Sequence, residues 1–192
     1  MTMLTSMLSG NQQLNPSDTP TFAGVKTNAN VGTAATGSTA VEYGDGYEHT
    51  TVLTVDTTLP AIAGGADLAI GKLVYTLPAG AVMVRAAYVS VSITQTEGNI
   101  TADTPDVGLG TTIASGAVAG LSGTAAFENI MTGQTAADCD GTATVETVTS
   151  SLDIESGDDH TIYVNVADGW AASGDTAALL SGTVVLHWQF FA

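Results

Sequence analysis

The C-terminal stretch, residues 181–192, constrains the fold more than any other part of the chain. Its sequence, SGTVVLHWQFFA, alternates with a period of two, so an extended chain would place on one face the side chains of Val184, Leu186, Trp188 and Phe190. Such a period, rich in β-branched and aromatic residues, predicts a β-strand. Because so apolar a strand would cause aggregation at an exposed sheet edge, we expect it inside a sheet or in an oligomer interface, with these four residues as the contacts.

Other stretches predict strands in the same way, and turn-forming residues separate them. They are residues 49–59, 68–77, 82–95, 107–110, 142–149 and 160–167, while residues 125–131 fit either a strand or a short helix. In the longest stretch, Val89, Val91 and Ile93 alternate with serine and threonine, which is the half-buried pattern of an antiparallel sheet. About eight short strands at this spacing predict an all-β fold, an antiparallel β-sandwich or a jelly roll.

The charge of the chain excludes some classes of partner. Only 11% of the residues are charged, and 19 acidic residues face three basic ones, Lys26, Lys72 and Arg85, for a net charge of −16. Binding to a phosphate backbone needs clustered lysine and arginine, so we expect no nucleic-acid partner, and an anionic membrane surface is disfavoured for the same reason. An acidic surface with little lysine favours solubility instead.

The N-terminal part differs in composition from the rest. Up to residue 39 it carries only Asp18 and Lys26 as charged residues and shows little hydrophobic periodicity, a composition that predicts disorder in a free segment. The sequence Gly44-Asp45-Gly46 then marks a break. We therefore expect an extended arm over residues 1–46, fastened to another subunit or a larger assembly, and a β-sandwich over residues 47–192. The candidate arm contacts are Leu4, Met7, Leu8, Pro20 and Phe22.

Several segments resemble proteins of tailed bacteriophages. The arm segment DTPTFAGV, residues 18–25, is similar to a short motif that precedes the globular β domain of phage fibre proteins. Similarity to head fibres and capsid decoration proteins extends over VGLGTTIASG (107–116), ENIMTGQTA (128–136), IYVNVADGW (162–170) and SGTVVLHW (181–188). This resemblance implies a viral structural protein, a homotrimer that binds the major capsid protein on the outer surface of the virion and stabilises the shell. It implies no catalytic residues and no cofactor.

A search of the sequence for chemistry supports a protein without enzymatic activity. The segment Gly120-Leu121-Ser122-Gly123 lacks the spacing of a serine nucleophile elbow, and the single Cys139 is expected to be a buried thiol. The segment around Asp138 and Asp140 fails as a calcium loop of the EF-hand type, because Ala136 and Thr147 stand where ligands are required.

Two further readings concern bound ligands. Asp158, Asp159 and His160 could offer two carboxylates and an imidazole to a divalent cation, although aspartate before a strand is also a common turn residue, so we expect no resident metal. An alternative function is a tail-fibre module that recognises host surface glycans, with aromatic platforms formed by Tyr43, Tyr47 and Trp170 in expected loops. A secreted carbohydrate-binding domain is a third interpretation, which the lack of export-signal features at the N-terminus disfavours.

Overall fold

The structure of the protein is a computed structural model that describes residues 30–63, 69–115, 120–122, 126–136, 138–156, 158–167 and 174–191. The candidate arm contacts Leu4, Met7, Leu8, Pro20 and Phe22 lie outside these residues, as does Trp170.

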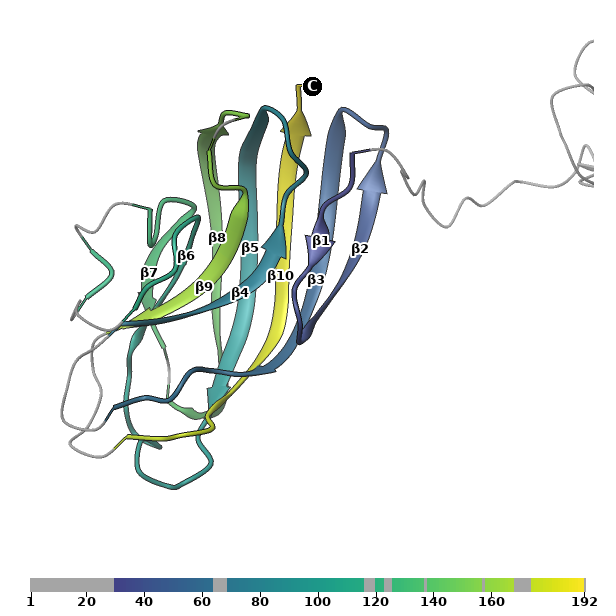
Figure 1. Cartoon of the computed structure of the whole chain (residues 1–192). Helices are drawn as coiled ribbons and strands as arrows, with labels where there is room; N and C mark the ends of the chain where they lie inside the picture. The colour runs from purple at the N-terminus through teal and green to yellow at the C-terminus, as the bar shows by residue number, and fades with distance from the viewer. Residues whose placement is uncertain are drawn as a thin grey trace, which may run out of the picture.

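Ten strands form two five-stranded antiparallel sheets that pack face to face (Figure 1). Sheet A has the order β1-β4-β9-β6-β7 and consists of β1 (Thr33–Ala34), β4 (Ile70–Thr76), β9 (Thr161–Ala167), β6 (Asp106–Gly110) and β7 (Met131–Thr135). Sheet B has the order β2-β3-β10-β5-β8 and consists of β2 (Ser38–Gly44), β3 (Glu48–Thr58), β10 (Leu179–Phe190), β5 (Val82–Thr94) and β8 (Asp140–Ile154). The predicted all-β sandwich is therefore confirmed.

The last eight strands follow the order of a jelly roll. These strands form four antiparallel pairs that together make one long hairpin. The pairs are β3 with β10, β4 with β9, β5 with β8 and β6 with β7. Rolling that hairpin brings β10 beside β5 and β6 beside β9, which creates the two sheets. Strands β1 and β2 extend one edge of each sheet.

The core lies between the sheets and is made by the inward face of each strand. The largest side chains that are fully buried there include Trp188, Tyr75 and Leu53. Along β5 the predicted alternation is confirmed, because Val89, Val91 and Ile93 are 1–2% exposed while the residues between them are half-buried or exposed. Removing this apolar surface from water is the main source of stability.

The C-terminal strand lies in the centre of sheet B, which confirms the expectation that it lies inside a sheet. Val184, Leu186 and Trp188 are at most 1% exposed and belong to the core, and Phe190 packs against that core. Val184, Leu186 and Trp188 are therefore core residues of the chain itself, and Phe190 is partly buried beside them. The outward side chains of the same strand are the ones that a partner could reach.

The sheets begin earlier than the sequence predicted. Strands β1 and β2 occupy residues 33–44, which we expected in the arm, and Gly44-Asp45-Gly46 forms the turn of the β2–β3 hairpin rather than a domain boundary. In this turn Asp45 Oδ1 accepts hydrogen bonds from the backbone N–H groups of Tyr47 and Glu48, and Gly44 and Gly46 have positive φ. These two strands could not be predicted from the sequence, because β1 is short and β2 is an edge strand with few buried positions.

Residues 125–131, for which helix and strand were both open, form no helix in their described part. Residues 126–130 are turns and bends, and β7 begins at Met131.

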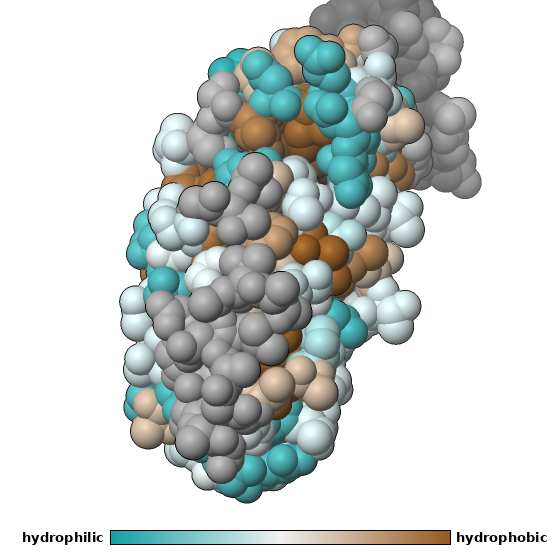
Figure 2. All heavy atoms as spheres, turned by 60° about the vertical axis from the view of Figure 1, so that its left-hand side comes forward, coloured by the Kyte–Doolittle hydropathy of each residue, from teal (hydrophilic) through white to brown (hydrophobic). Residues whose placement is uncertain are grey.

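Figure 2 shows the side of the molecule that carries β6 and β7: strongly hydrophilic residues gather at the two ends of the body, and weakly polar residues cover the flanks between them.

Candidate functional site

A groove of about 650 Å³ crosses the outer face of sheet B at the end where the β2–β3 hairpin turns. Strands β2, β3, β5 and β10 all contribute to it, and its lining residues are Tyr43, Gly44, Glu48, His49, Thr50, Arg85, His187, Trp188 and Gln189. We call it the Arg85 groove. Side chains that are far apart in the sequence meet there because β10 lies between β3 and β5.

A chain of hydrogen bonds links three strands within the groove. The Nε and Nη2 atoms of Arg85 donate to Gln189 Oε1 at 3.0 and 2.8 Å, and Gln189 Nε2 donates to Glu48 Oε1 at 2.8 Å. Beside this chain, Thr50 Oγ1 and His187 Nδ1 lie 3.0 Å apart. The groove thus presents a guanidinium, an amide, a carboxylate and a hydroxyl within one small area, a set that can both donate and accept hydrogen bonds.

A β-bulge explains why Arg85 belongs to the groove. The pairing of β5 with β10 shifts between Val84 and Ala86, where β5 has one residue more than β10, and Arg85 is that extra residue. Val84 is buried in the core, whereas Arg85 is exposed on the outer face. Bulges commonly redirect a side chain in this way, and they cannot be recognised from a two-residue period alone.

A second polar cluster lies on the inner side of the same strands and is closed to solvent. The rings of His49 and Trp188 stack with their centroids 3.9 Å apart, and Trp188 Nε1 donates to Thr51 Oγ1 at 2.8 Å. Thr51 Oγ1 donates in turn to Glu42 Oε1, whose other oxygen lies 3.7 Å from His49 Nδ1. The side chains of His49 and Glu42 are 0% and 8% exposed, although His49 and Trp188 also border the Arg85 groove. Among the described residues, Glu42 Oε2 and both ring nitrogens of His49 have no hydrogen-bond partner, so the hydrogen-bonding capacity of this buried cluster is only partly used.

Cys139 lies in the core, as the sequence predicted. Burial, followed by the nearby carboxylates of Asp103, Asp138, Asp140 and Asp175, raises the pKa of Cys139 to about 12. Nucleophilic cysteines need a thiolate, which this environment disfavours. The neighbouring Asp140 serves the backbone, because its Oδ1 accepts a hydrogen bond from Thr142 N at 2.9 Å.

The residues suggested for a divalent cation act as turn residues. Asp158 Oδ2 accepts a hydrogen bond from Glu155 N, and Asp159 Oδ1 accepts one from Thr161 N. The two ring nitrogens of His160 lie 2.8 and 2.7 Å from the carbonyl oxygens of Asp158 and Gly80. Among the described residues, no three histidine, cysteine, aspartate or glutamate side chains gather as metal ligands would.

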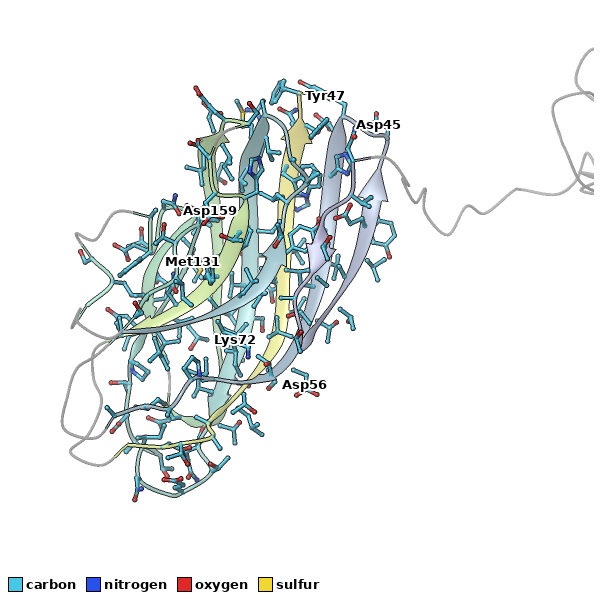
Figure 3. The ribbon with its side chains drawn as sticks, viewed as in Figure 1. Asp45, Tyr47, Asp56, Lys72, Met131 and Asp159 are labelled. Carbon is cyan, nitrogen blue, oxygen red and sulfur yellow. The ribbon has the colours of Figure 1, made fainter. Side chains whose placement is uncertain are left out.

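The expected aromatic platforms are arranged differently from the prediction. Tyr43 belongs to strand β2 rather than a loop and borders the Arg85 groove with 37% of its surface exposed. Tyr47 packs edge to face against Phe191, with ring centroids 5.5 Å apart, and lies at the hairpin turn (Figure 3). Tyr43, rather than Tyr47, is therefore the tyrosine placed to contact a ligand in the groove.

Nothing in the described part of the chain forms a helix with the length and apolar character needed to cross a membrane. Comparison with protein-family models, with curated proteins and with solved structures found no match for this chain.

Proposed function

We propose that this chain is a viral structural protein, a capsid decoration or head-fibre subunit that binds the major capsid protein on the outer surface of a phage capsid and stabilises the shell. The observation that carries the proposal is the jelly roll of β3–β10, a topology that recurs in viral capsid domains. Residues 1–29 precede this body and carry the fibre-like motif. Many copies, each bound weakly through such a segment, would reinforce a shell by avidity.

The chemistry of the described residues agrees with a binding protein. The one cysteine is a buried thiol with a raised pKa, and the polar side chains suggested for a cation hold turns instead. The fold alone does not decide between functions, because one topology hosts many, so the proposal depends on a direct test of binding.

The test uses capsid shells of the virus that encodes the chain, mixed with the full-length protein or with a variant that lacks residues 1–25. We expect the truncated protein to keep its β circular dichroism spectrum and to lose co-sedimentation with the shells. A second variant keeps the full length and has Leu4, Met7, Leu8 and Phe22 changed to alanine. This variant should bind the shells as weakly as the truncated protein. Full binding by the truncated protein would overturn the role of the arm.

A second candidate function, recognition of a host surface glycan, is favoured by the Arg85 groove. Sugar hydroxyls donate and accept hydrogen bonds together, and Arg85, Gln189 and Glu48 supply both kinds of partner beside the ring of Tyr43. The volume of the Arg85 groove, about 650 Å³, is within the usual range for small-molecule sites.

Nuclear magnetic resonance separates this candidate from the first. Titration with methyl glycosides of glucose, galactose and N-acetylglucosamine should shift the side-chain N–H signals of Arg85 and Gln189 if the groove binds sugars. The Arg85→Gln variant should respond more weakly. Unchanged signals at millimolar concentrations of every glycoside would exclude the glycan function and leave capsid binding untouched.

A further inference from the structure

The outer face of sheet B carries three consecutive rows of side chains that contain no aspartate, glutamate, lysine or arginine. The pairing registers define each row across β2, β3, β10, β5 and β8. The central row is Val41, Val52, Val185, Tyr88 and Thr147. The row on one side is Tyr43, Thr50, His187, Ala86 and Thr149, and the row on the other side is Thr39, Thr54, Thr183, Ser90 and Val145. We call these three rows the neutral face.

The absence of charge from this face is unexpected in a chain that carries 19 acidic residues. The nearest acidic residues on β3 are Glu48 and Asp56, and each is four positions from Val52. At about 3.4 Å per residue this places them about 14 Å from the central row. That distance exceeds the screening length of about 8 Å at physiological ionic strength. Figure 3 shows Asp45 and Asp56 at opposite ends of the β2–β3 hairpin.

The apolar side chains of the central row are not needed for the core. Val41 and Tyr88 are each 38% exposed, and Val145 in the adjoining row is 56% exposed. The inward neighbours Leu53, Val89 and Val184 already fill the space between the sheets. A row of valine and tyrosine facing water over four strands therefore costs solvation free energy in the single chain, and a partner that covered it would recover that free energy.

We propose that a second copy of this chain covers the neutral face, so that two sheets B pack face to face around a two-fold axis parallel to β10. Sheets that pack in this way keep their strands within about 30° of each other. The axis lays β5 of one copy over β3 of the other, so that Tyr88 lies over Val52 of the second copy and Val185 over its own equivalent. This isologous contact closes as a dimer, which differs from the homotrimer that the resemblance to phage proteins implies.

Charge complementarity favours a second copy over another partner. The same axis brings Arg85 of each copy over the Glu48 region of the other copy. Because each chain has one arginine, the dimer interface contains two guanidinium groups, one from each copy. A copy of the neutral face avoids placing the carboxylates of two chains with net charge −16 against each other.

The size of the face suits a small specific interface. Five strands at about 4.8 Å and three rows at about 6.8 Å cover roughly 500 Å² per copy. Two copies would bury roughly 1,000 Å², which is the lower limit for a specific protein–protein contact. The contact does not depend on capsid binding, since it can be measured with the isolated full-length protein.

Sedimentation analysis of the full-length chain tests the proposal. At about 100 μM, well above a dissociation constant in the low micromolar range, we expect a dimer. The Tyr88→Glu variant should dissociate at least about tenfold more readily, because it places a carboxylate in the contact. The matched control is Ile113→Glu, which adds the same charge at a side chain that is 43% exposed and lies outside sheet B. Circular dichroism confirms the fold of both variants.

A charge-swap experiment tests the two-fold geometry itself. Because Val185 lies over its own equivalent, the Val185→Glu and Val185→Lys variants should each be monomeric, and an equimolar mixture of the two should form a heterodimer. A monomeric wild-type protein at about 100 μM would overturn the proposal. A trimer, equal weakening by Ile113→Glu and Tyr88→Glu, or a mixture that stays monomeric would overturn it as well.

Discussion

The two faces of sheet B are built from similar residues and have different environments. On β10 the inward residues Val184 and Leu186 are fully buried, whereas their neighbours Val185 and His187 are half-buried and exposed. The inner face packs against sheet A, and the outer face has no covering element among the described residues. An alternating apolar pattern therefore identifies a strand without revealing which of its faces belongs to the core.

The difference also separates stability from association. Side chains on the inner face stabilise the single chain, because they lose their contact with water on folding. Side chains in the central row of the outer face contribute little to that stability, and any benefit from covering them requires a partner.

The largest effect is expected from a pair of aromatic residues, one on each face. Trp188→Ala should lower the free energy of unfolding by about 3–5 kcal/mol, since it empties a site that is 1% exposed. Tyr88→Ala should lower it by no more than about 1 kcal/mol. Urea unfolding at a concentration low enough to keep the chain monomeric measures both values. Equal losses would show that the outer face contributes to the core.

The interior also contains a carboxylate, Asp175, which is 0% exposed. Its oxygens accept hydrogen bonds from the backbone N–H groups of Thr96, Glu97 and Ala177 and from the hydroxyl of Thr96. Asp175→Ala leaves these donors unpaired, which should cost about 3 kcal/mol at pH 7. The exposed Asp56 is the control, and Asp56→Ala should change stability by less than about 0.5 kcal/mol.

The effect of Asp175 should depend on pH with a defined sign. Burial raises the pKa of Asp175, but the hydrogen bonds from Ala177, Thr96 and Glu97 outweigh burial and hold that pKa below the ordinary value of 3.8. Its contribution is therefore present above pH 3.8 and is lost as the pH falls through the lower pKa of the folded state. Urea unfolding from pH 7 into this acidic range should show the wild type and Asp175→Ala converging. A constant difference would contradict this role.

The smallest effect is expected in the Arg85 groove. Arg85→Gln removes two part-buried hydrogen bonds from the exposed Arg85 to Gln189, so the free energy of unfolding should fall by about 1 kcal/mol. The same variant should weaken self-association, because Arg85 faces the second copy. Gln189→Ala removes the same bonds while keeping the guanidinium, and a loss of association that is equal in both variants would argue against a direct contact by Arg85.

The sequence predicted those parts of the fold that depend on local alternation. Residues 160–167 and 181–192 have a strong two-residue period, and they form β9 and the central strand β10. Strand β2 was not predicted, because its inward positions are occupied by residues such as Glu42. The Glu42 carboxylate accepts hydrogen bonds from Thr51 and the backbone of Gly32 instead of packing in an apolar core. Such a position has no hydrophobic period to detect.

The groove and the neutral face could not be predicted, for two physical reasons. The groove combines residues 43–44, 48–50, 85 and 187–189, which meet only after the jelly-roll hairpin has rolled, and Arg85 enters it through a bulge. The neutral face depends on the registers of four strand pairs, and a shift of one residue would turn every side chain to the other face.

Under the proposed function, image reconstruction of intact particles of the virus that encodes this chain is the decisive measurement. We expect density for the jelly roll on the outside of the capsid shell, with residues 1–29 against the major capsid protein. Density at the tail tip, or a shell that carries no copies of the chain, would contradict the proposed function.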